Sequence, residues 1–333
     1  MEQYLPLRDG RTLAYAEDGN ISSKTVVLHF HGLFTVGGAL LKSPVLLSKN
    51  IHLIMPTLPG WGNTSPPPPS TPYNDCIASD MTTLLSHLYP DSNDRGIKLY
   101  ISGSSFGSVP AQILYGAPYD KFPFGRCISG VLLTGALTPF RYHKDYAKQM
   151  TWESYFMFGP IGYYVPFNLV SHVMKFMLAR KMATIEGAGA RLRETFFNRM
   201  DQAEQEMFAR WSEKHGTVPE NVVRRMGEGC VKSVSKSWEG FMLTLPLLHS
   251  DWGFRPDALD EEHSRPRVLL TAGKDDHMTP VTYAHYLAAN YKNARIKDIG
   301  GGHMSMLYKN DELLDWLRSS PALPRRADIR RLE

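Results

Sequence analysis

The 333-residue sequence has few of the features that mark secreted proteins and metalloproteins. It contains only three cysteines, Cys76, Cys127 and Cys230, an odd number without the spacing of a metal site. This usage predicts reduced thiols in a cytoplasmic protein rather than a disulfide framework. The N-terminus also lacks the basic and apolar regions of a signal peptide, which favours the same compartment. We therefore predict no bound metal.

Charge of one sign and long apolar runs are scarce as well. The 37 Lys and Arg nearly balance the 33 Asp and Glu, and no basic cluster alternates with aromatics, which argues against a nucleic-acid partner. The most apolar stretch, residues 155–178, is interrupted by Pro160, Pro166 and Lys175, whereas a spanning helix needs about 20 mostly apolar residues. We expect no stable membrane insertion, and transient contact with a membrane surface stays open.

What the sequence has is a regular alternation of strand-like and helix-like patterns. An antiparallel pair is expected over residues 5–9 and 12–17, with Asp9-Gly10 as its turn. Apolar runs rich in β-branched residues follow at 25–30, 51–56, 97–102, 127–134, 267–272 and 294–299. Helical spacing occurs at 75–88, from 108 onward, and around 280–290 and 305–318. This alternation predicts an α/β fold, with a mostly parallel central sheet flanked by helices.

A G-x-S-x-G motif, residues 103–107, lies directly between a predicted strand and a predicted helix. In that context it indicates a nucleophile elbow with Ser105 at its tip. Ser105 should have a strained backbone conformation, and Gly103 and Gly107 should let strand and helix pass closely.

Two later loops carry the groups that a serine nucleophile needs. Asp275 and Asp276 follow the run at 267–272, and His303 follows the last strand run. A serine hydroxyl needs an adjacent base, and a histidine base needs a carboxylate. With the His31-Gly32 turn upstream, these motifs in this order resemble the α/β-hydrolase superfamily, in particular its serine-esterase branch.

The resemblance implies a role for each site residue. Its acid stands three residues after the strand-ending glycine and four before a proline, which selects Asp276 over Asp275, so that the catalytic residues would be Ser105, Asp276 and His303. The backbone N–H groups of Leu33 and Phe106 would form the oxyanion hole. His31 would shape that loop rather than act as the base. No cofactor is expected.

Between residues 140 and 260 the strand signals stop, where the superfamily commonly inserts a helical cap after the sixth strand. This segment would be the cap, residues 1–139 and 261–320 the core domain, and 321–333 a basic tail. The segment holds 9 of the 15 methionines and many aromatics, which could line an apolar cavity over Ser105 or form the cap's own core. The substrate-binding candidates are Met157, Phe158, Met174 and Phe176.

The sequence thus predicts a serine hydrolase that cleaves an ester or lactone of a small, fairly apolar molecule through an acyl-enzyme. The alternatives are a peptidase, a carbon–carbon bond hydrolase, a thioesterase, a lyase or a non-catalytic binding protein. A peptidase specific for free amino termini would use an acidic cluster in the cap, but Glu204 and Glu206 look like an exposed helical face. Residues 66–69, four prolines, look like a rigid spacer. The oligomeric state is not predicted.

Overall fold

The computed structural model describes residues 1–38, 44–90, 96–309, 312, 313 and 315. Their centre is an eight-stranded sheet in the order β1-β2-β4-β3-β5-β6-β7-β8. The first three strands in this order pair antiparallel, and all later neighbours are parallel. The strands are β1 (Glu2–Pro6), β2 (Thr12–Gly19), β3 (Thr25–Phe30), β4 (His52–Pro56), β5 (Lys98–Ser104), β6 (Ile128–Thr134), β7 (Arg267–Ala272) and β8 (Ala294–Asp298).

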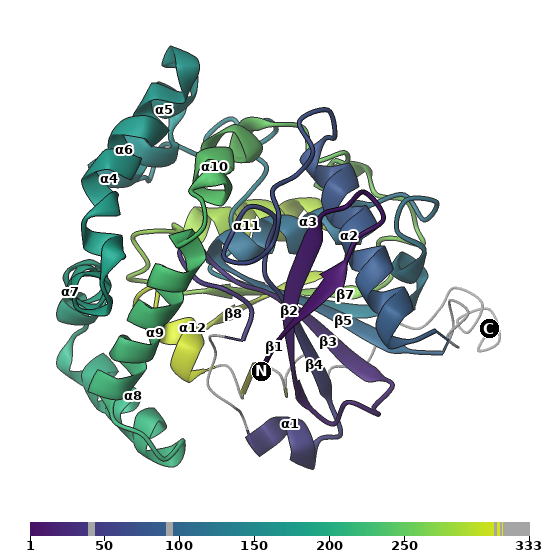
Figure 1. The fold of residues 1–333 in the computed structure, drawn as a ribbon, viewed down its shortest axis with the longest axis horizontal. Helices are drawn as coiled ribbons and strands as arrows, with labels where there is room; N and C mark the ends of the chain where they lie inside the picture. Colours follow the sequence, from purple (N-terminus) through teal and green to yellow (C-terminus); the bar gives the residue numbers. More distant parts are fainter. Residues whose placement is uncertain (39–43, 91–95, 310–311, 314, 316–333) are drawn as a thin grey trace.

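Helices cover both faces of this sheet (Figure 1). One face carries α2 (Tyr73–Leu88), α3 (Ser108–Gly116) and α11 (Val281–Asn290). The other face carries α1 (Pro44–Ser48), while α12 (Ser305–Tyr308) follows the last strand. The mostly parallel sheet flanked by helices confirms the predicted fold class.

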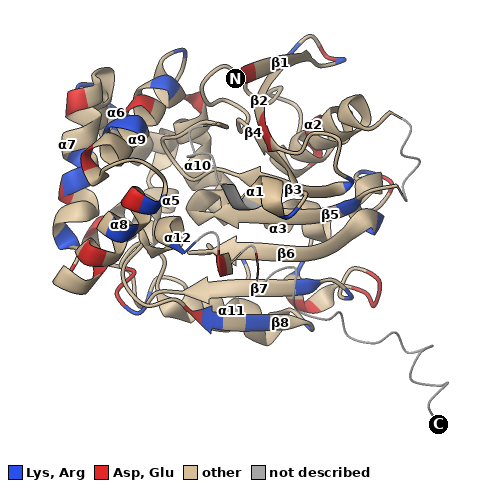
Figure 2. Cartoon of the chain, turned by 90° about the horizontal axis from the view of Figure 1, so that it is seen from below, with Lys and Arg blue, Asp and Glu red and all other residues tan. Residues whose placement is uncertain are grey.

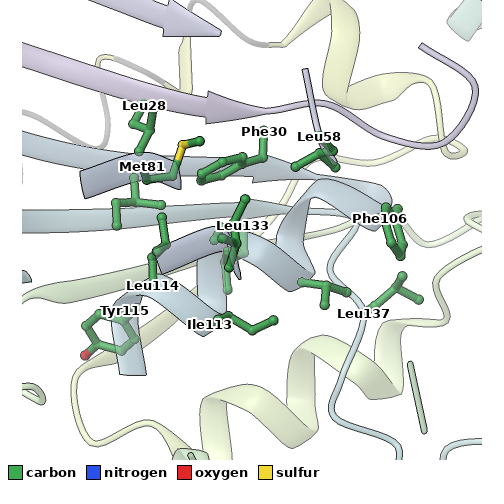
Figure 3. Close-up of a cluster of buried hydrophobic side chains, with 14 of the residues drawn as sticks. Leu28, Phe30, Leu58, Met81, Phe106, Ile113, Leu114, Tyr115, Leu133 and Leu137 are labelled. Atoms are coloured by element: carbon green, nitrogen blue, oxygen red, sulfur yellow. The ribbon is translucent and has the colours of Figure 1, made fainter. Parts of the chain in front are cut away.

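The alternation of side chains along each strand explains why both faces are buried. In β3, Val26, Leu28 and Phe30 belong to the large cluster that packs against α2 and α3, part of which Figure 3 shows. Val27, between them, packs on the opposite face with Leu46 of α1 and with Leu313. A doubly covered parallel sheet therefore requires apolar residues on both faces of its strands, as β3 has.

Most element boundaries match the sequence prediction within a few residues. The strands at 25–30 and 267–272 are found as predicted, and the antiparallel pair is present with Gly10 at a φ of +82°. The strand predicted to begin at Leu5 begins at Glu2. Of the helix predicted for 305–318, the structure describes α12, which ends at Tyr308, and much of the remainder lies outside the described residues. The predicted basic tail at 321–333 also lies outside them.

Between β6 and β7 the chain forms helices and no strand, which we call the helical region (residues 140–260). Its α-helices are α4 (Trp152–Phe158), α5 (Pro160–Tyr164), α6 (Leu169–Ala179), α7 (Ile185–Thr195), α8 (Gln202–Lys214), α9 (Pro219–Val234) and α10 (Glu239–His249). Figure 1 shows them gathered to one side of the sheet, with α9 and α10 between the sheet and the outer helices.

Charged residues gather on the outer helices (Figure 2), whereas the cysteines lie in the interior. Figure 2 shows Lys and Arg interspersed with Asp and Glu over the outer helices, with the middle of the sheet almost uncharged. All three cysteines are buried, and none of them forms a disulfide with another described residue. Among the described residues, no helix is long and apolar enough to cross a membrane.

Candidate active site

The turn that follows β5 holds Ser105 in an unusual backbone conformation. Its φ is +53°, a left-handed value that costs energy for a residue with a side chain. A Cβ on Gly103 would lie 2.2 Å from the carbonyl oxygen of Gly107, and one on Gly107 would lie 2.1 Å from that of Phe30. Both glycines are thus required by close packing, and the turn presents Ser105, half-buried, at the carboxyl edge of the sheet.

His303 links Ser105 to Asp276. Its Nε2 lies 3.0 Å from Ser105 Oγ, and its Nδ1 lies 2.8 Å from Asp276 Oδ2. Because an ionised carboxylate can only accept, Nδ1 carries a proton and donates it to Asp276. Nε2 of the neutral ring is then the acceptor for the serine hydroxyl. The three side chains follow β5, β7 and β8 and meet at one edge of the sheet because parallel strands end there together.

Asp276 is held by four donated hydrogen bonds. Besides His303, the backbone N–H groups of Met278 and Thr279 donate to Oδ1, and the Thr279 hydroxyl donates to Oδ2. Burial by itself raises the pKa of Asp276, but the electrostatic interaction with the imidazole of His303 and the hydrogen bonds from His303 and Thr279 outweigh this effect. The pKa therefore lies below its usual value. Asp275, by contrast, is exposed.

His31 follows β3 and has both ring nitrogens occupied. Its Nε2 accepts a hydrogen bond from the backbone N–H of Leu58 at 2.9 Å, and its Nδ1 donates to the carbonyl of Gly32 at 2.7 Å. Burial lowers the pKa of His31 to about 4, so the ring is neutral near pH 7. A Cβ on Gly32 would lie 3.4 Å from that of Ser105, which places this loop directly beside the serine.

An aromatic cluster joins this loop to the helical region. The ring centroid of Phe34 lies 5.6 Å from that of Trp61. It lies 5.2 Å and 6.0 Å from the ring centroids of Phe241 and Trp238, which belong to the helical region. Phe34 has a φ of +53°, so its backbone is also left-handed. These rings were not predicted from the sequence, because nothing in their spacing reveals that segments about 200 positions apart meet.

The helical region reaches His303 through two further side chains that sequence reasoning missed. Phe196, directly after α7, stacks on the imidazole with centroids 5.7 Å apart and planes 20° apart. Glu204 of α8 accepts hydrogen bonds from the backbone N–H of Gly302 at 2.8 Å and from the Tyr308 hydroxyl at 3.0 Å. The expectation that Glu204 belongs to an exposed face is therefore wrong, because it is buried, whereas Glu206 is exposed as expected.

The position of Glu204 on α8 explains its burial. Glu204, Phe208 and Ser212 are spaced by four residues and form the buried stripe of this helix. Asp201 caps the helix by accepting a hydrogen bond from the Glu204 N–H at 2.8 Å, which fixes the first turn. The pattern Asp201-x-x-Glu204 is a capping-box signal that predicts a helix start there. It also predicts a local hydrogen bond for the carboxylate, which instead bonds to Gly302 and Tyr308.

A cavity of about 70 Å³ lies beside His303, and Phe196, Met200 and Glu204 are among the residues that line it. None of the four predicted substrate-binding residues lines this cavity. Met157, Phe158 and Met174 are half-buried, and the last two pack against the main core. Phe176 is 85% exposed, so its side chain faces solvent in this structure.

A larger, open hollow of about 480 Å³ lies elsewhere, at the amino ends of β5 and β6. Lys98, Ser129 and Glu262 are among its lining residues. Ligands of open parallel sheets bind at the carboxyl ends of the strands, so we assign the site to the edge that carries Ser105. Within the described ranges, no group of three His, Cys, Asp or Glu side chains is arranged to hold a metal ion.

Comparisons with known proteins agree with this architecture. The sequence model of the alpha/beta hydrolase family matches residues 26–316. The fold is similar to a hydrolase from Pseudomonas aeruginosa PA01, with 16% identity, a TM-score of 0.59 and coverage of 96% of this chain and 98% of the other. It is also similar to an esterase from Exiguobacterium antarcticum, with 17% identity, a TM-score of 0.58 and coverage of 96% and 100%.

A third similar structure is described as an N-acyl homoserine lactone degrading enzyme. Its identity is 16% and its TM-score 0.59, and the alignment covers 96% of this chain and all of the other. At these identities the likeness concerns the fold. No curated protein matches the chain significantly.

Proposed function

The chain belongs to the alpha/beta hydrolase family, and on that premise we propose that it is a serine hydrolase cleaving an ester or lactone of a small, fairly apolar molecule. The observation that carries this proposal is the unbroken chain of hydrogen bonds from Ser105 through His303 to Asp276. A serine becomes a nucleophile when a neutral histidine accepts its proton, and these contacts support that role for His303.

The reaction follows from these contacts. Ser105 Oγ attacks the substrate carbonyl while His303 Nε2 takes its proton, which gives a tetrahedral oxyanion. Collapse of this intermediate breaks the bond to the alcohol oxygen, and His303 returns the proton to the departing alcohol. A water molecule, deprotonated by His303, then attacks the acyl-enzyme, and the second collapse releases the acid and restores Ser105. Asp276 stays ionised and stabilises the charged imidazole in both steps.

The oxyanion needs donors that are already in place, since donors that must reorient stabilise the transition state less. We assign them to the backbone N–H groups of Phe106, the residue after the nucleophile, and Leu33. The proximity of Gly32 to Ser105 supports the second assignment. The bonds from His31 to Leu58 and to Gly32 brace this loop, which gives His31 a structural rather than a basic role.

We further propose that the helical region acts as a cap over a core domain made of residues 1–139 and 261–320. Phe196 and Glu204 would position His303, the first by stacking on the ring and the second by holding Gly302. Met157, Phe158 and Met174 would belong to the lid side of the substrate pocket, and the aromatic rings around Phe34 would form its wall near the oxyanion loop. An apolar acyl or alcohol group fits such surroundings.

Two alternatives are less well supported. A peptidase for free amino termini would need a carboxylate available to an ammonium group, but Glu204 Oε1 already accepts two hydrogen bonds. A non-catalytic receptor would have no need for the bonds that orient His303. A lactone substrate is also considered because the fold is similar to that of the N-acyl homoserine lactone degrading enzyme. The cytoplasmic location stays a prediction from the low cysteine content.

The first test is covalent labelling by a fluorophosphonate probe, followed by turnover on p-nitrophenyl esters of graded length and on lactones. We expect labelling of the native protein and its loss in Ser105→Ala, with turnover reduced by about three or more orders of magnitude. Ser104→Ala is the matched control, since the neighbouring hydroxyl is engaged by Thr134. Retention of more than about a tenth of turnover in Ser105→Ala would exclude this serine as the nucleophile.

A further inference from the structure

The helical region exposes an unusual amount of apolar surface on its outer helices. Ten large apolar or aromatic side chains between residues 152 and 177 are 37–92% exposed. They are Trp152, Phe156, Ile161, Tyr163, Tyr164, Phe167, Leu169, Val173, Phe176 and Met177. Together they offer on the order of 1,000 Å² of surface, against the few hundred Å² usual for the largest apolar patch of a soluble monomer. All ten belong to α4, α5, α6 or the turn between α5 and α6.

Helix α6 shows that this exposure is built into the sequence. Residues at spacings of three and four form its outward stripe, and that stripe consists of Leu169, His172, Val173, Phe176 and Met177. Its inward side contains the buried Ser171 and Leu178. A surface helix normally turns its polar side chains outward, whereas α6 has apolar side chains on its outward side as well as on its inward side. Burial of this apolar face against a less polar surface would be favourable.

The turn before α6 presents one aromatic ring at a conformational cost. Phe167 and Asn168 both have left-handed backbones, with φ of +58° and +52°. The ring of Phe167 is nevertheless 92% exposed, so no packing inside the chain compensates for the strain. The turn is held from within, because the Asn168 side-chain amide donates to the carbonyl of Met242 on α10 and its oxygen accepts from Ser171. Phe167 is therefore displayed on a braced turn.

The charges beside this surface are positive. Lys175 and Arg180 lie on or just after α6, and neither has an acidic partner within the described part of the chain. Glu153, the acidic residue between positions 152 and 177, is paired with Arg191 at 2.7 Å. Trp and Tyr side chains, which have a polar tip and an apolar body, favour the boundary between lipid headgroups and acyl chains.

We propose that the outer face of α4, α5 and α6 docks on a lipid surface that contains anionic lipids, without spanning it. Lys175 and Arg180 would contact the headgroups, while Trp152, Phe167 and their neighbours enter the acyl boundary. A deformable lipid surface fits this face better than a second copy of the chain, because Figure 1 shows α5 projecting at the outer end of the molecule. A second copy would need a hollow that matches this projection, whereas a lipid surface can deform around it. The inference does not depend on the proposed reaction.

The test measures flotation of the full-length protein with vesicles of phosphatidylcholine, alone or mixed with phosphatidylglycerol. We expect binding to the mixed vesicles, weakened by salt. The double variant Trp152→Gln, Phe167→Asn should lower the partition coefficient about tenfold to 100-fold, since each ring contributes apolar area. Asn suits the left-handed position of Phe167. Lys175→Gln combined with Arg180→Gln should lower the ratio of binding to anionic over neutral vesicles about tenfold.

Val218→Asn is the matched control, because Val218 is a half-exposed apolar residue that directly precedes α9, outside α4, α5 and α6. This variant should bind like the native protein. Ser105→Ala should also bind normally, which separates this inference from the proposed reaction. Absence of binding to either vesicle, or equal binding by the Trp152 and Phe167 double variant, would overturn the proposal. So would sedimentation equilibrium showing a lipid-free dimer that this double variant dissociates, since the face would then be a contact between copies.

Discussion

The loops at the carboxyl edge of the sheet and the helical region contribute to the site in opposite ways. The sheet loops supply Ser105, Asp276 and His303, whose positions are fixed by strand ends, tight turns and four hydrogen bonds to one carboxylate. The helical region supplies contacts to these residues rather than the residues themselves. We infer that the proposed chemistry is set by local backbone geometry, whereas the proposed selection of the substrate is set by packing between distant segments.

Electrostatics make the same contrast. In the sheet loops, Asp276 is buried among donors and faces His303, which becomes charged in the reaction that we propose. In the helical region, Glu204 is equally buried, but it accepts from a backbone N–H and a tyrosine hydroxyl, neither of which changes charge in the reaction. We infer that Asp276 stabilises a transition state, whereas Glu204 maintains a geometry. The predictions below test this division.

The largest effect is expected at the sheet edge, where Asp276→Asn should reduce kcat about 10³-fold to 10⁴-fold. An amide in this position favours the wrong tautomer of His303 and no longer stabilises its charged form. Asp275→Asn, a neighbouring exposed carboxylate, should change kcat less than about threefold. Steady-state turnover of a soluble ester measures both. Equal losses in the two variants would remove the basis for choosing Asp276.

The next largest effect is expected on acid stability. Burial lowers the pKa of His29 and of His31 to about 4 from the usual 6.5. Between these values the unfolded chain binds protons that the folded protein excludes, so stability falls as the pH falls from about 6.5 toward 4. Each of the two histidines should cost about 2 kcal/mol between pH 7 and pH 5.

Urea unfolding at pH 7 and pH 5 measures this loss of stability. In His29→Asn the loss should be smaller by the roughly 2 kcal/mol that one histidine contributes. Asp276 acts in a different window. Its lowered pKa adds stability above the pKa of the unfolded chain, and this stability is lost only as the pH falls through the still lower folded value. Stability that stays constant from pH 7 to pH 5 would contradict the assignment of both histidines as neutral groups of the folded protein.

On the side of the helical region, single substitutions should change substrate preference without abolishing the reaction. Replacement of Met157, Phe158 or Met174 by Ala is expected to shift the preferred ester chain length by a factor of about 10 to 200, since each methylene in a pocket contributes about 1–3 kcal/mol. Phe176→Ala should shift it less, because this ring faces solvent. A chain-length series gives the result, with labelling of Ser105 unchanged. Identical preferences in all variants would place the pocket elsewhere.

The smallest effect tests whether the helical region also serves the chemistry. Glu204→Ala should lower kcat about tenfold with little change in KM, because the loop that carries His303 loses its anchor. Glu204→Gln keeps an acceptor oxygen and should stay within about threefold of native turnover, and Glu206→Ala, on the exposed face, should have no effect. A purely structural role would lower Tm but leave the kcat of the folded protein intact, and that outcome would refute positioning.

The same division explains what the sequence predicts well. Strand boundaries were recovered because each strand has its own apolar pattern, and Ser105, Asp276 and His303 were singled out because their spacing from nearby glycines and prolines is local. Glu204 was misjudged because its burial depends on the stripe it shares with Phe208 and on a loop about 100 residues away. Phe176 could not be placed either, because an aromatic residue fits a pocket and an exposed face equally well by composition.

The connection between β6 and β7 has a consequence for how such a protein changes over generations. The two strands are parallel neighbours, so the chain needs only a crossover of about a dozen residues to join them. Residues 135–266 fill this place instead. Because both ends of this stretch are anchored in adjacent strands, insertions, deletions and exchanges within it leave the pairing of the sheet intact. On the proposed role of this stretch, changes within it can alter the substrate that is accepted, while Ser105, Asp276 and His303 stay on the sheet loops outside it.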